Sequence, residues 1–200
     1  YEMISGDWSS DVCSSDLVQI NQDSVKWLTN NYDGRIIFMS TCSVYGAQDG
    51  ILDENSNVSP LSVYALTKLK AESYLKDKNV IIFRLGTLFG VGDCFSRIRL
   101  DLVVNTMTAR AFTQNTISVY GGEQFRPLLH VSDVADAIIQ NIDSQNTGIY
   151  NLQKQNVRIT DLAYQIRNHF PDLEVVTKDI PMQDTRSYRV SCDKANNELG

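Results

Sequence analysis

Three polar residues in the first half of the chain have the types and spacing for acid–base chemistry. Thr41 follows a short apolar run at residues 35–40, and Tyr64 and Lys68 stand four positions apart in a segment with helical character. Residues four apart lie on the same face of a helix, so these two side chains can point into one site. The pattern indicates a site that transfers a proton to or from a hydroxyl group.

The phenol of Tyr64 is the expected base of such a site. A free phenol has a pKa of roughly 10 and is mostly protonated at neutral pH. A nearby ammonium group favours the phenolate, so we expect Lys68 to lower the pKa of Tyr64. The phenolate would then accept a hydroxyl proton while a hydride leaves the same carbon, with Thr41 holding the oxygen by a hydrogen bond. The alternative is a Tyr and a Lys on an ordinary amphipathic helix.

The apolar pattern predicts the elements that must hold these side chains. Residues 18–31 and 62–76 are predicted helices, and residues 35–40 and 79–85 are strands whose continuous apolar runs indicate burial on both faces. A strand, a helix and a second strand with short connections form a crossover unit, so the sheet is predicted to be parallel. The rest of the sequence predicts helices at 100–112, 133–142 and 161–169 and strands at 116–120, 128–131, 148–152 and 174–177. Ser132 or Asp133 is the predicted cap of the helix at 133–142, and Thr160 is that of the helix at 161–169.

These elements predict an α/β fold: the C-terminal part of a doubly wound, Rossmann-like parallel sheet with a small interleaved α/β substrate lobe. Residues 18–90 would form an incomplete nucleotide-binding half that carries the Thr, Tyr and Lys, and residues 91–200 a lobe interleaved with the remaining Rossmann elements. The sequence has no GxGxxG or GxxGxxG turn, which holds the pyrophosphate after the first strand of such folds. We therefore expect the chain to be truncated at both ends.

Residues 1–17 do not match the rest of the chain. They are rich in serine, contain no Lys or Arg, and have no helical or strand period. Residues 7–17 can be back-translated into a string that resembles a short-read sequencing adapter. We therefore expect residues 1–17 to be a non-native segment and leave them out of the fold interpretation.

The composition argues against several classes of function. The chain carries 24 acidic and 18 basic residues, and four of the acidic ones lie in residues 1–17, which leaves 24 − 4 = 20 against 18. This mild acidity, without a basic stripe, argues against nucleic-acid binding, and no apolar run approaches the ~20 residues that span a membrane. Two histidines and widely spaced cysteines predict neither a metal site nor a disulfide framework, and they fit a cytoplasmic protein.

Over residues 18–200, several motifs together resemble the NAD-dependent epimerase/dehydratase family, the extended branch of the short-chain dehydrogenase/reductases. Thr41, Tyr64 and Lys68 resemble its catalytic triad, and residues 84–90 (RLGTLFG) resemble the strand end beside its nicotinamide and sugar nucleotide. The roles that the resemblance implies are catalysis by Thr41, Tyr64 and Lys68, cofactor contacts by Asn21, Tyr64, Lys68 and Leu85, and substrate contacts by Thr87, Asn105, Arg126 and Arg186.

The chain departs from parts of the family at two places. Where the 4,6-dehydratases carry Asp-Glu directly after the catalytic Thr, this chain has Cys42 and Ser43. Neither side chain supplies a carboxyl group, which argues against dehydration. Many relatives have Asn where Thr87 stands. His130 is expected to be a structural, hydrogen-bonded histidine and not a general base.

The resemblance implies NAD as the cofactor, with NADP as the alternative, and a nucleotide-diphosphate sugar as the substrate. The parent protein is expected to be a nucleotide-sugar epimerase that works by transient oxidation and reduction of a sugar hydroxyl, and this fragment is expected to be inactive. An NADP-dependent keto-sugar reductase, or another nucleotide-sugar oxidoreductase, is one alternative. A catalytically silent binding or scaffold relative is the alternative of another class.

The resemblance also implies a homodimer when the protein is full length, formed through the helices at residues 18–31 and 62–76. Four apolar side chains would offer the partner face, although all four could instead serve the core of the chain: Val25, Leu28, Leu66 and Leu69.

Overall fold

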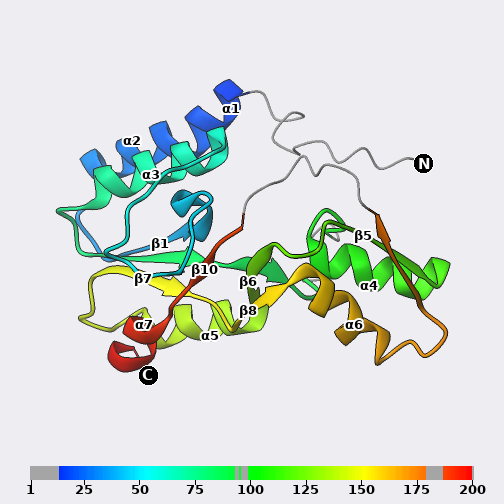
Figure 1. The fold of residues 1–200 in the computed structure, drawn as a ribbon. Helices are drawn as coiled ribbons and strands as arrows, with labels where there is room; N and C mark the ends of the chain where they lie inside the picture. The colour runs from blue at the N-terminus through cyan, green and yellow to red at the C-terminus, as the bar shows by residue number, and fades with distance from the viewer. Residues whose placement is uncertain (1–13, 93–94, 96–98, 179–186, 200) are drawn as a thin grey trace.

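A three-stranded parallel sheet lies at the centre of the first lobe. The computed structural model describes residues 14–92, 95, 99–178 and 187–199. The sheet has the order β1 (Ile36–Thr41), β3 (Val80–Leu85) and β7 (Gly148–Leu152). Helices α2 (Ser24–Asn31) and α3 (Val63–Leu75) cover one face, and α5 (Val131–Asn141) and α7 (Asp193–Glu198) cover the other, as Figure 1 shows. The predicted α/β class with a parallel sheet is confirmed.

Alternation along β3 explains why this strand is apolar throughout. Val80 and Ile82 pack with Leu75 of α3 on one face of the sheet. Ile81 and Phe83 belong to a second core cluster, which includes side chains of α5 and α7. A central strand covered by helices on both faces has no solvent side, so every position from 80 to 83 is apolar.

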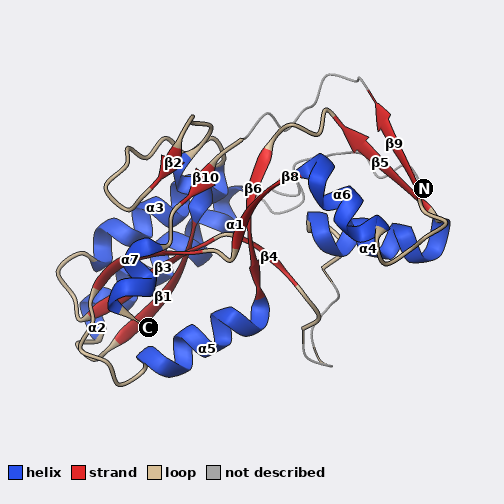
Figure 2. Cartoon of the chain, turned by 60° about the horizontal axis from the view of Figure 1, so that its bottom comes forward, coloured by secondary structure: helices blue, strands red, loops and turns tan. Residues whose placement is uncertain are grey.

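The second lobe is built on two small sheets. One has the order β4 (Thr87–Phe89), β6 (Phe125–His130) and β8 (Gln155–Arg158), with β4 parallel and β8 antiparallel to β6. The other pairs β5 (Thr116–Tyr120) with β9 (Glu174–Lys178), and α4 (Val103–Gln114) and α6 (Ile159–Arg167) pack beside it, as Figure 2 shows. A separate core fills this lobe, with Ile117, Leu128 and Leu162 among its buried side chains.

The two lobes are interleaved in sequence. β7 follows the second lobe's β6 in the chain and returns to the central sheet, next to β3. A short late strand, β10 (Arg189–Val190), pairs with β2 (Ile51–Leu52). The division at residue 90 stays a prediction, because the chain crosses between the two lobes more than once.

The N-terminal helical region is longer than predicted. α1 (Ser14–Val18), a π-helical turn at Gln19–Asp23 and α2 follow one another without a break. The predicted helix at residues 18–31 therefore begins earlier, at Ser14, inside the segment predicted to be non-native. Residues 1–13 of that segment lie outside the described residues.

Helix ends and short strands are where the structure departs from the sequence-based elements. His130, and not Ser132 or Asp133, caps α5: its Nδ1 accepts a hydrogen bond of 3.2 Å from the Ser132 backbone N–H. α6 begins at Ile159, so Thr160 lies within the helix and not at its cap. The pattern also missed four strands, β2, β4, β8 and β10, since strands of two to four residues have too few positions to show an alternation.

The two N-terminal helices turn most of their predicted partner residues inward. Val25 and Leu28 pack in the core beneath α2 and α3, and Leu69 packs against another core cluster. Leu66 is 46% exposed and Trp27 of α2 is 66% exposed. The homodimer stays a prediction. Of the four residues predicted to face a partner, Leu66 is the exposed one.

A buried ion pair joins α3 to β3. The Arg84 guanidinium donates to both carboxylate oxygens of Glu72, from Nη2 at 2.7 Å and from Nε at 3.1 Å, and both side chains are 4% exposed. Ser40 of β1 donates to the same carboxylate at 2.5 Å. Arg84 also donates to the Tyr45 hydroxyl at 3.0 Å, which in turn donates to Asn151 of β7 at 2.8 Å. Burial alone would lower the pKa of Arg84, but Glu72 and Tyr45 raise it on balance, so the guanidinium stays charged.

The described part of the chain contains neither a membrane-spanning helix nor a cluster of metal ligands. No helix in it has the length and apolar character needed to cross a bilayer. No group of three or more His, Cys, Asp or Glu side chains in it is arranged to hold a metal ion.

We expect Glu72→Gln to destabilise the protein strongly. The substitution leaves the Arg84 guanidinium buried without a counter-charge, and breaking a buried pair in this way costs about 3–5 kcal/mol. Urea unfolding followed by circular dichroism measures the loss. Lys78→Ala is the matched control, since it removes the surface pair between Lys78 and Asp33 (2.8 Å), in which Asp33 is 96% exposed. Equal unfolding midpoints for the two variants would contradict the large contribution to stability that we expect of the buried pair.

Candidate active site

The carboxyl end of β1 and the first turn of α3 bring Thr41 and Tyr64 together. Thr41 is the last residue of β1 and pairs in register with Leu85 at the end of β3. Ser62 caps α3, with its Oγ accepting a 3.2 Å hydrogen bond from the Ala65 N–H, and this places Tyr64 in the first helical turn. The Thr41 side chain is close enough to the Tyr64 phenol to act on it, in the direction that lowers the pKa of the phenol. The predicted acid–base pair is therefore assembled by two elements that are distant in sequence.

Lys68 lies one turn further along α3, but its ammonium group is directed at β1. Its Nζ donates a 3.0 Å hydrogen bond to the Met39 carbonyl oxygen and lies 4.9 Å from the centre of the Phe38 ring. Burial lowers the pKa of Lys68. A carbonyl acceptor and an aromatic face both favour a cation, so they partly offset this desolvation.

The pKa of Tyr64 differs from the expectation. Burial raises it above the usual value, while the charge of Arg99 and the hydrogen bond from Thr41 act in the opposite direction. We expected Lys68 to lower the pKa of Tyr64. The pKa is instead raised, and the charge that opposes the rise belongs to Arg99. The cation that favours the phenolate comes from residue 99, in the segment between β4 and α4, because Lys68 is turned toward Met39 and Phe38.

The remaining predicted cofactor residues lie around this pair. Asn21, in the π-helical turn, donates a 3.4 Å hydrogen bond from Nδ2 to the Thr67 hydroxyl on α3. Thr67 in turn donates to the Tyr64 carbonyl oxygen at 2.9 Å. Leu85 ends β3 and is partly buried against the core shared with α5 and α7. Asn21 thus contacts the turn of α3 that carries Tyr64, and Leu85 stands beside Thr41 at the carboxyl edge of the sheet.

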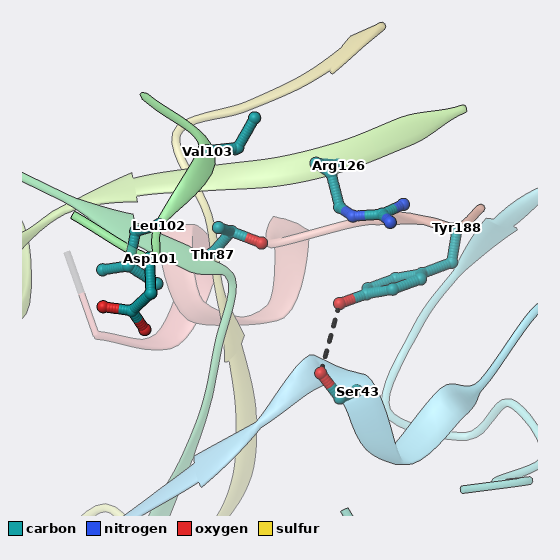
Figure 3. A pocket seen from close by; sticks show the side chains of 7 residues that line it. All are labelled: Ser43, Thr87, Asp101, Leu102, Val103, Arg126 and Tyr188. Carbon is teal, nitrogen blue, oxygen red and sulfur yellow. Dashed lines mark hydrogen bonds between the residues drawn. The ribbon is translucent and has the colours of Figure 1, made fainter. Parts of the chain in front are cut away.

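A pocket of about 190 Å³ opens next to this edge, between the two lobes. Figure 3 shows the side chains that line it: Ser43, Thr87, Asp101, Leu102, Val103, Arg126 and Tyr188. Ser43 comes from the turn after Thr41, and Tyr188 comes from the late segment before β10. The hydroxyl oxygens of these two residues are 3.4 Å apart, which closes one side of the pocket with a hydrogen bond. Thr87 and Arg126, two of the predicted substrate residues, both line it.

Arg126 reaches the pocket from β6. Its Nη1 donates a 3.0 Å hydrogen bond to the Phe125 carbonyl oxygen, which fixes the side chain along its own strand. Figure 3 shows the guanidinium on the same side of the pocket as Tyr188. A partly buried guanidinium in a polar pocket is suited to bidentate binding of a phosphate or carboxylate group.

Asn105, one of the predicted substrate residues, is not among the described residues that line the pocket. The amide of Asn105 is bonded to backbone: Oδ1 accepts from the Gly90 N–H at 3.1 Å, and Nδ2 donates to the Arg99 carbonyl at 3.0 Å and to the Gly90 carbonyl at 3.3 Å. Asn105 therefore fixes two chain segments beside the pocket. Arg186 lies outside the described residues.

The sequence interpretation missed several residues of the site. Ser43 and Tyr188 line the pocket, and Asp101 does so while pairing with Arg99. Ser43 stands two places after Thr41, so its position in the motif could have pointed to the pocket. For Arg99, Asp101 and Tyr188 no spacing signal exists, because they join the site only through the packing of the two lobes.

Cys42 serves the core. It is fully buried, and its thiol donates a 3.1 Å hydrogen bond to the Arg84 carbonyl oxygen. Burial raises the pKa of the thiol strongly, with Arg84 opposing the rise. A thiol held in this way does not ionise near neutral pH and cannot replace the carboxylic acid that stands at this position in the dehydratases.

Comparison with known proteins places the chain in a family. A family model described as the NAD dependent epimerase/dehydratase family matches residues 15–152. The chain belongs to this family. The predicted resemblance is confirmed, and the match begins three residues before position 18, where the resemblance was first seen.

Individual relatives agree with this assignment. The chain is 32% identical over 109 residues to an uncharacterised UDP-glucose epimerase, YtcB, of Bacillus subtilis (strain 168), a match that covers 51% of this chain and 33% of that protein. It is 25% identical over 189 residues to UDP-glucuronic acid decarboxylase 3 of Arabidopsis thaliana, covering 86% of this chain and 54% of the relative. The chain thus spans about a third to a half of the length of these relatives.

The fold is also similar to solved structures. The structure of TunA, an NAD-dependent NDP-hexosamine 5,6-dehydratase involved in tunicamycin biosynthesis, superposes with a TM-score of 0.79 at 25% identity. The superposition covers 92% of this chain and 63% of that one. The predicted Rossmann-like architecture is therefore confirmed.

We expect Tyr64 to titrate above the roughly 10 of a free tyrosine, because burial of its hydroxyl outweighs the opposing charge and hydrogen bond. The ¹³Cζ resonance of labelled tyrosine, followed against pH by NMR and assigned with Tyr64→Phe, measures the midpoint. Tyr45, whose pKa burial raises to about 12, is an internal reference. A Tyr64 midpoint below that of free tyrosine would show that the cation dominates over burial.

Proposed function

We propose that the protein is a nucleotide-sugar epimerase that oxidises and then reduces one sugar carbon with NAD. The observation that carries the proposal is the placement of Thr41 at the carboxyl end of β1, of Tyr64 in the first turn of α3, and of the Arg126 pocket beside them. In open α/β sheets ligands bind outside the carboxyl ends of the strands, which is where both features lie. The name of the Bacillus subtilis relative, a UDP-glucose epimerase, supports the same class.

The side chains present have complementary roles in this reaction. Tyr64, as the phenolate, accepts the proton of the sugar hydroxyl, and Thr41 holds the same oxygen by a hydrogen bond. Bound NAD would supply the hydride acceptor for that carbon, and its reduced form the hydride donor. Tyr64 keeps the proton at Oη and gives it back when the ketone is reduced. Hydride delivery to the other face of the sugar would invert the carbon, with no net change in protons or electrons over the cycle.

Several side chains at the sheet edge would hold the cofactor. Lys68 has three N–H donors, and the Met39 carbonyl takes one of them, so donors remain that would serve a ribose hydroxyl of the cofactor. Gly86 follows β3, and a Cβ there would come within 2.8 Å of the Pro127 carbonyl oxygen, so the backbone is closely packed at this edge. Tyr64, Lys68, Asn21 and Leu85 are the residues that we propose hold the cofactor.

The side chains that line the pocket favour binding of a diphosphate group over binding of a neutral group. Arg126 supplies a guanidinium, and Thr87, Ser43 and Tyr188 supply hydroxyl groups around it. Charge-assisted hydrogen bonds from a guanidinium to phosphate oxygens are about twice as strong as neutral ones. We therefore propose that the diphosphate binds at Arg126 and that the sugar extends toward Thr41 and Tyr64.

The turn after Thr41 argues for epimerisation over dehydration. Elimination of water needs an acid and a base in addition to the Tyr phenol, and Cys42 and Ser43 provide neither. Cys42 is withdrawn into the core, where its thiol is bonded to the Arg84 carbonyl. The hydroxyl of Ser43 faces Tyr188 and can bind a sugar oxygen but cannot serve as a strong acid.

We expect Tyr64→Phe, in the protein at its full natural length, to abolish most of the turnover while NAD affinity stays within a few fold. Loss of a general base reduces rate by about 10²–10⁴. Interconversion of UDP-glucose and UDP-galactose, followed by a coupled assay, measures kcat. Tyr74→Phe is the control on the same helix, since the Tyr74 hydroxyl accepts a hydrogen bond from Gln22 and does not line the pocket. A wild-type kcat in Tyr64→Phe would rule out the proposed base.

We expect Arg126→Ala to raise KM by about tenfold to a hundredfold, since a hydrogen bond to a charged group contributes about 1.5–3 kcal/mol. The effect on kcat should be smaller, because the diphosphate binds away from the reacting carbon. Steady-state kinetics with several nucleotide sugars measures both constants. Arg158→Ala is the control: it removes a guanidinium from the neighbouring strand that pairs with Asp161 at the surface. An unchanged KM for every active substrate would remove Arg126 from the site.

A further inference from the structure

The late segment at residues 187–191 joins the two lobes beside the pocket. It contains β10, which pairs with β2 of the first lobe and packs beside β6 of the second, as Figure 2 shows. The Ser191 backbone N–H donates to the Leu52 carbonyl at 2.8 Å, and Nδ2 of Asn151 donates to the Ser191 carbonyl at 3.2 Å. The end of the segment is therefore tied to the first lobe, by β2 and by β7.

The second lobe holds the same segment through the side chain of Asn156 on β8. Its Oδ1 accepts from the Val190 backbone N–H at 2.9 Å, and its Nδ2 donates to the Val190 carbonyl at 2.9 Å. The amide thus makes both of the bonds that a residue of a neighbouring antiparallel strand would make. At the start of the segment the Ser187 Oγ accepts from the Phe125 N–H at 3.1 Å, and the Arg189 guanidinium lies 5.0 Å from the centre of the Phe125 ring.

Tyr188 lies between these anchors and lines the pocket. The residue is 5% exposed, and its hydroxyl oxygen is 3.4 Å from that of Ser43, as Figure 3 shows. Tyr188 and Val190 are two residues apart and belong to the same core cluster. The bonds that fix the Val190 backbone therefore also set the place of the Tyr188 hydroxyl at the pocket.

We propose that Asn156 is a positioning residue for substrate binding, which sets the Tyr188 hydroxyl against Ser43 by holding the Val190 backbone. The inference rests on the proposed function, in which the pocket takes a nucleotide-diphosphate sugar. Ser43 comes from the first lobe, so the two hydroxyl groups keep their arrangement only while β8 of the second lobe holds the late segment. Asn156 is not among the described residues that line the pocket, and it acts on the substrate through Tyr188.

NMR of the full-length protein without ligand tests the placement of Tyr188. Its ¹³Cζ resonance, assigned with Tyr188→Phe, is compared in wild type, Asn156→Leu, Asn156→Ala and Gln155→Ala. Both substitutions of Asn156 remove the two bonds to Val190, and leucine keeps a side chain of similar shape, so we expect the Tyr188 resonance to shift in both. Gln155→Ala removes an exposed amide from the same strand and should leave the resonance unchanged. An unmoved resonance in either folded variant of Asn156 would overturn the proposal.

Steady-state kinetics gives a second readout, which a purely structural role for Asn156 would not move. In Asn156→Leu we expect KM for the nucleotide sugar to rise about two- to tenfold, the range that one neutral hydrogen bond contributes, with kcat nearly unchanged.

A double-mutant cycle shows whether the effect passes through Tyr188. Adding Asn156→Leu to Tyr188→Phe should change KM little, because the hydroxyl that Asn156 positions is already gone. Fully additive effects on KM, or a wild-type KM in Asn156→Leu, would overturn the proposal. The two proposals fail separately: a wild-type kcat in Tyr64→Phe counts against the proposed function, while an unmoved Tyr188 resonance counts against Asn156 alone.

Discussion

The buried pair of Glu72 and Arg84 is the interaction on which the geometry of this protein depends. A charge buried without its partner is costly, so α3 cannot slide or rotate on β3 without breaking the pair. Glu72 stands one turn after Lys68 and two turns after Tyr64 on the same helix, so the position of the pair also sets the height of both functional side chains above the sheet. The bonds from Ser40 and, through Tyr45, to Asn151 tie all three strands of the central sheet to this one point.

Several polar residues that could bind a ligand instead hold the backbone that forms the site. Asn105 fixes Gly90 and Arg99, and His130 caps α5. Lys68 is shared between such a role, at the Met39 carbonyl, and its proposed contact with the cofactor. These bonds satisfy buried or half-buried groups at the ends of strands and helices, where regular secondary structure leaves them unpaired. A pocket between two lobes needs this reinforcement because, in the described part of the chain, the lobes have separate sheets.

The electrostatics of the proposed base come from a balance between the two lobes. Burial of the Tyr64 hydroxyl disfavours the phenolate, and the first lobe opposes this with the Thr41 hydrogen bond. The second lobe contributes the Arg99 charge, held by Asp101.

The sequence by itself determined the α/β class, the parallel β1–α3–β3 unit and the family, because continuous apolar runs and the spacing of Thr41, Tyr64 and Lys68 are local properties. It also pointed to Thr87 and Arg126, which the structure places in one pocket. It missed the strands of two to four residues and the start of α5, whose cap is a histidine. Only the tertiary structure decided where Lys68 and Asn105 direct their polar atoms, and that Glu72 pairs with Arg84. Each of these depends on contacts between segments distant in sequence, which residue spacing along one element does not encode.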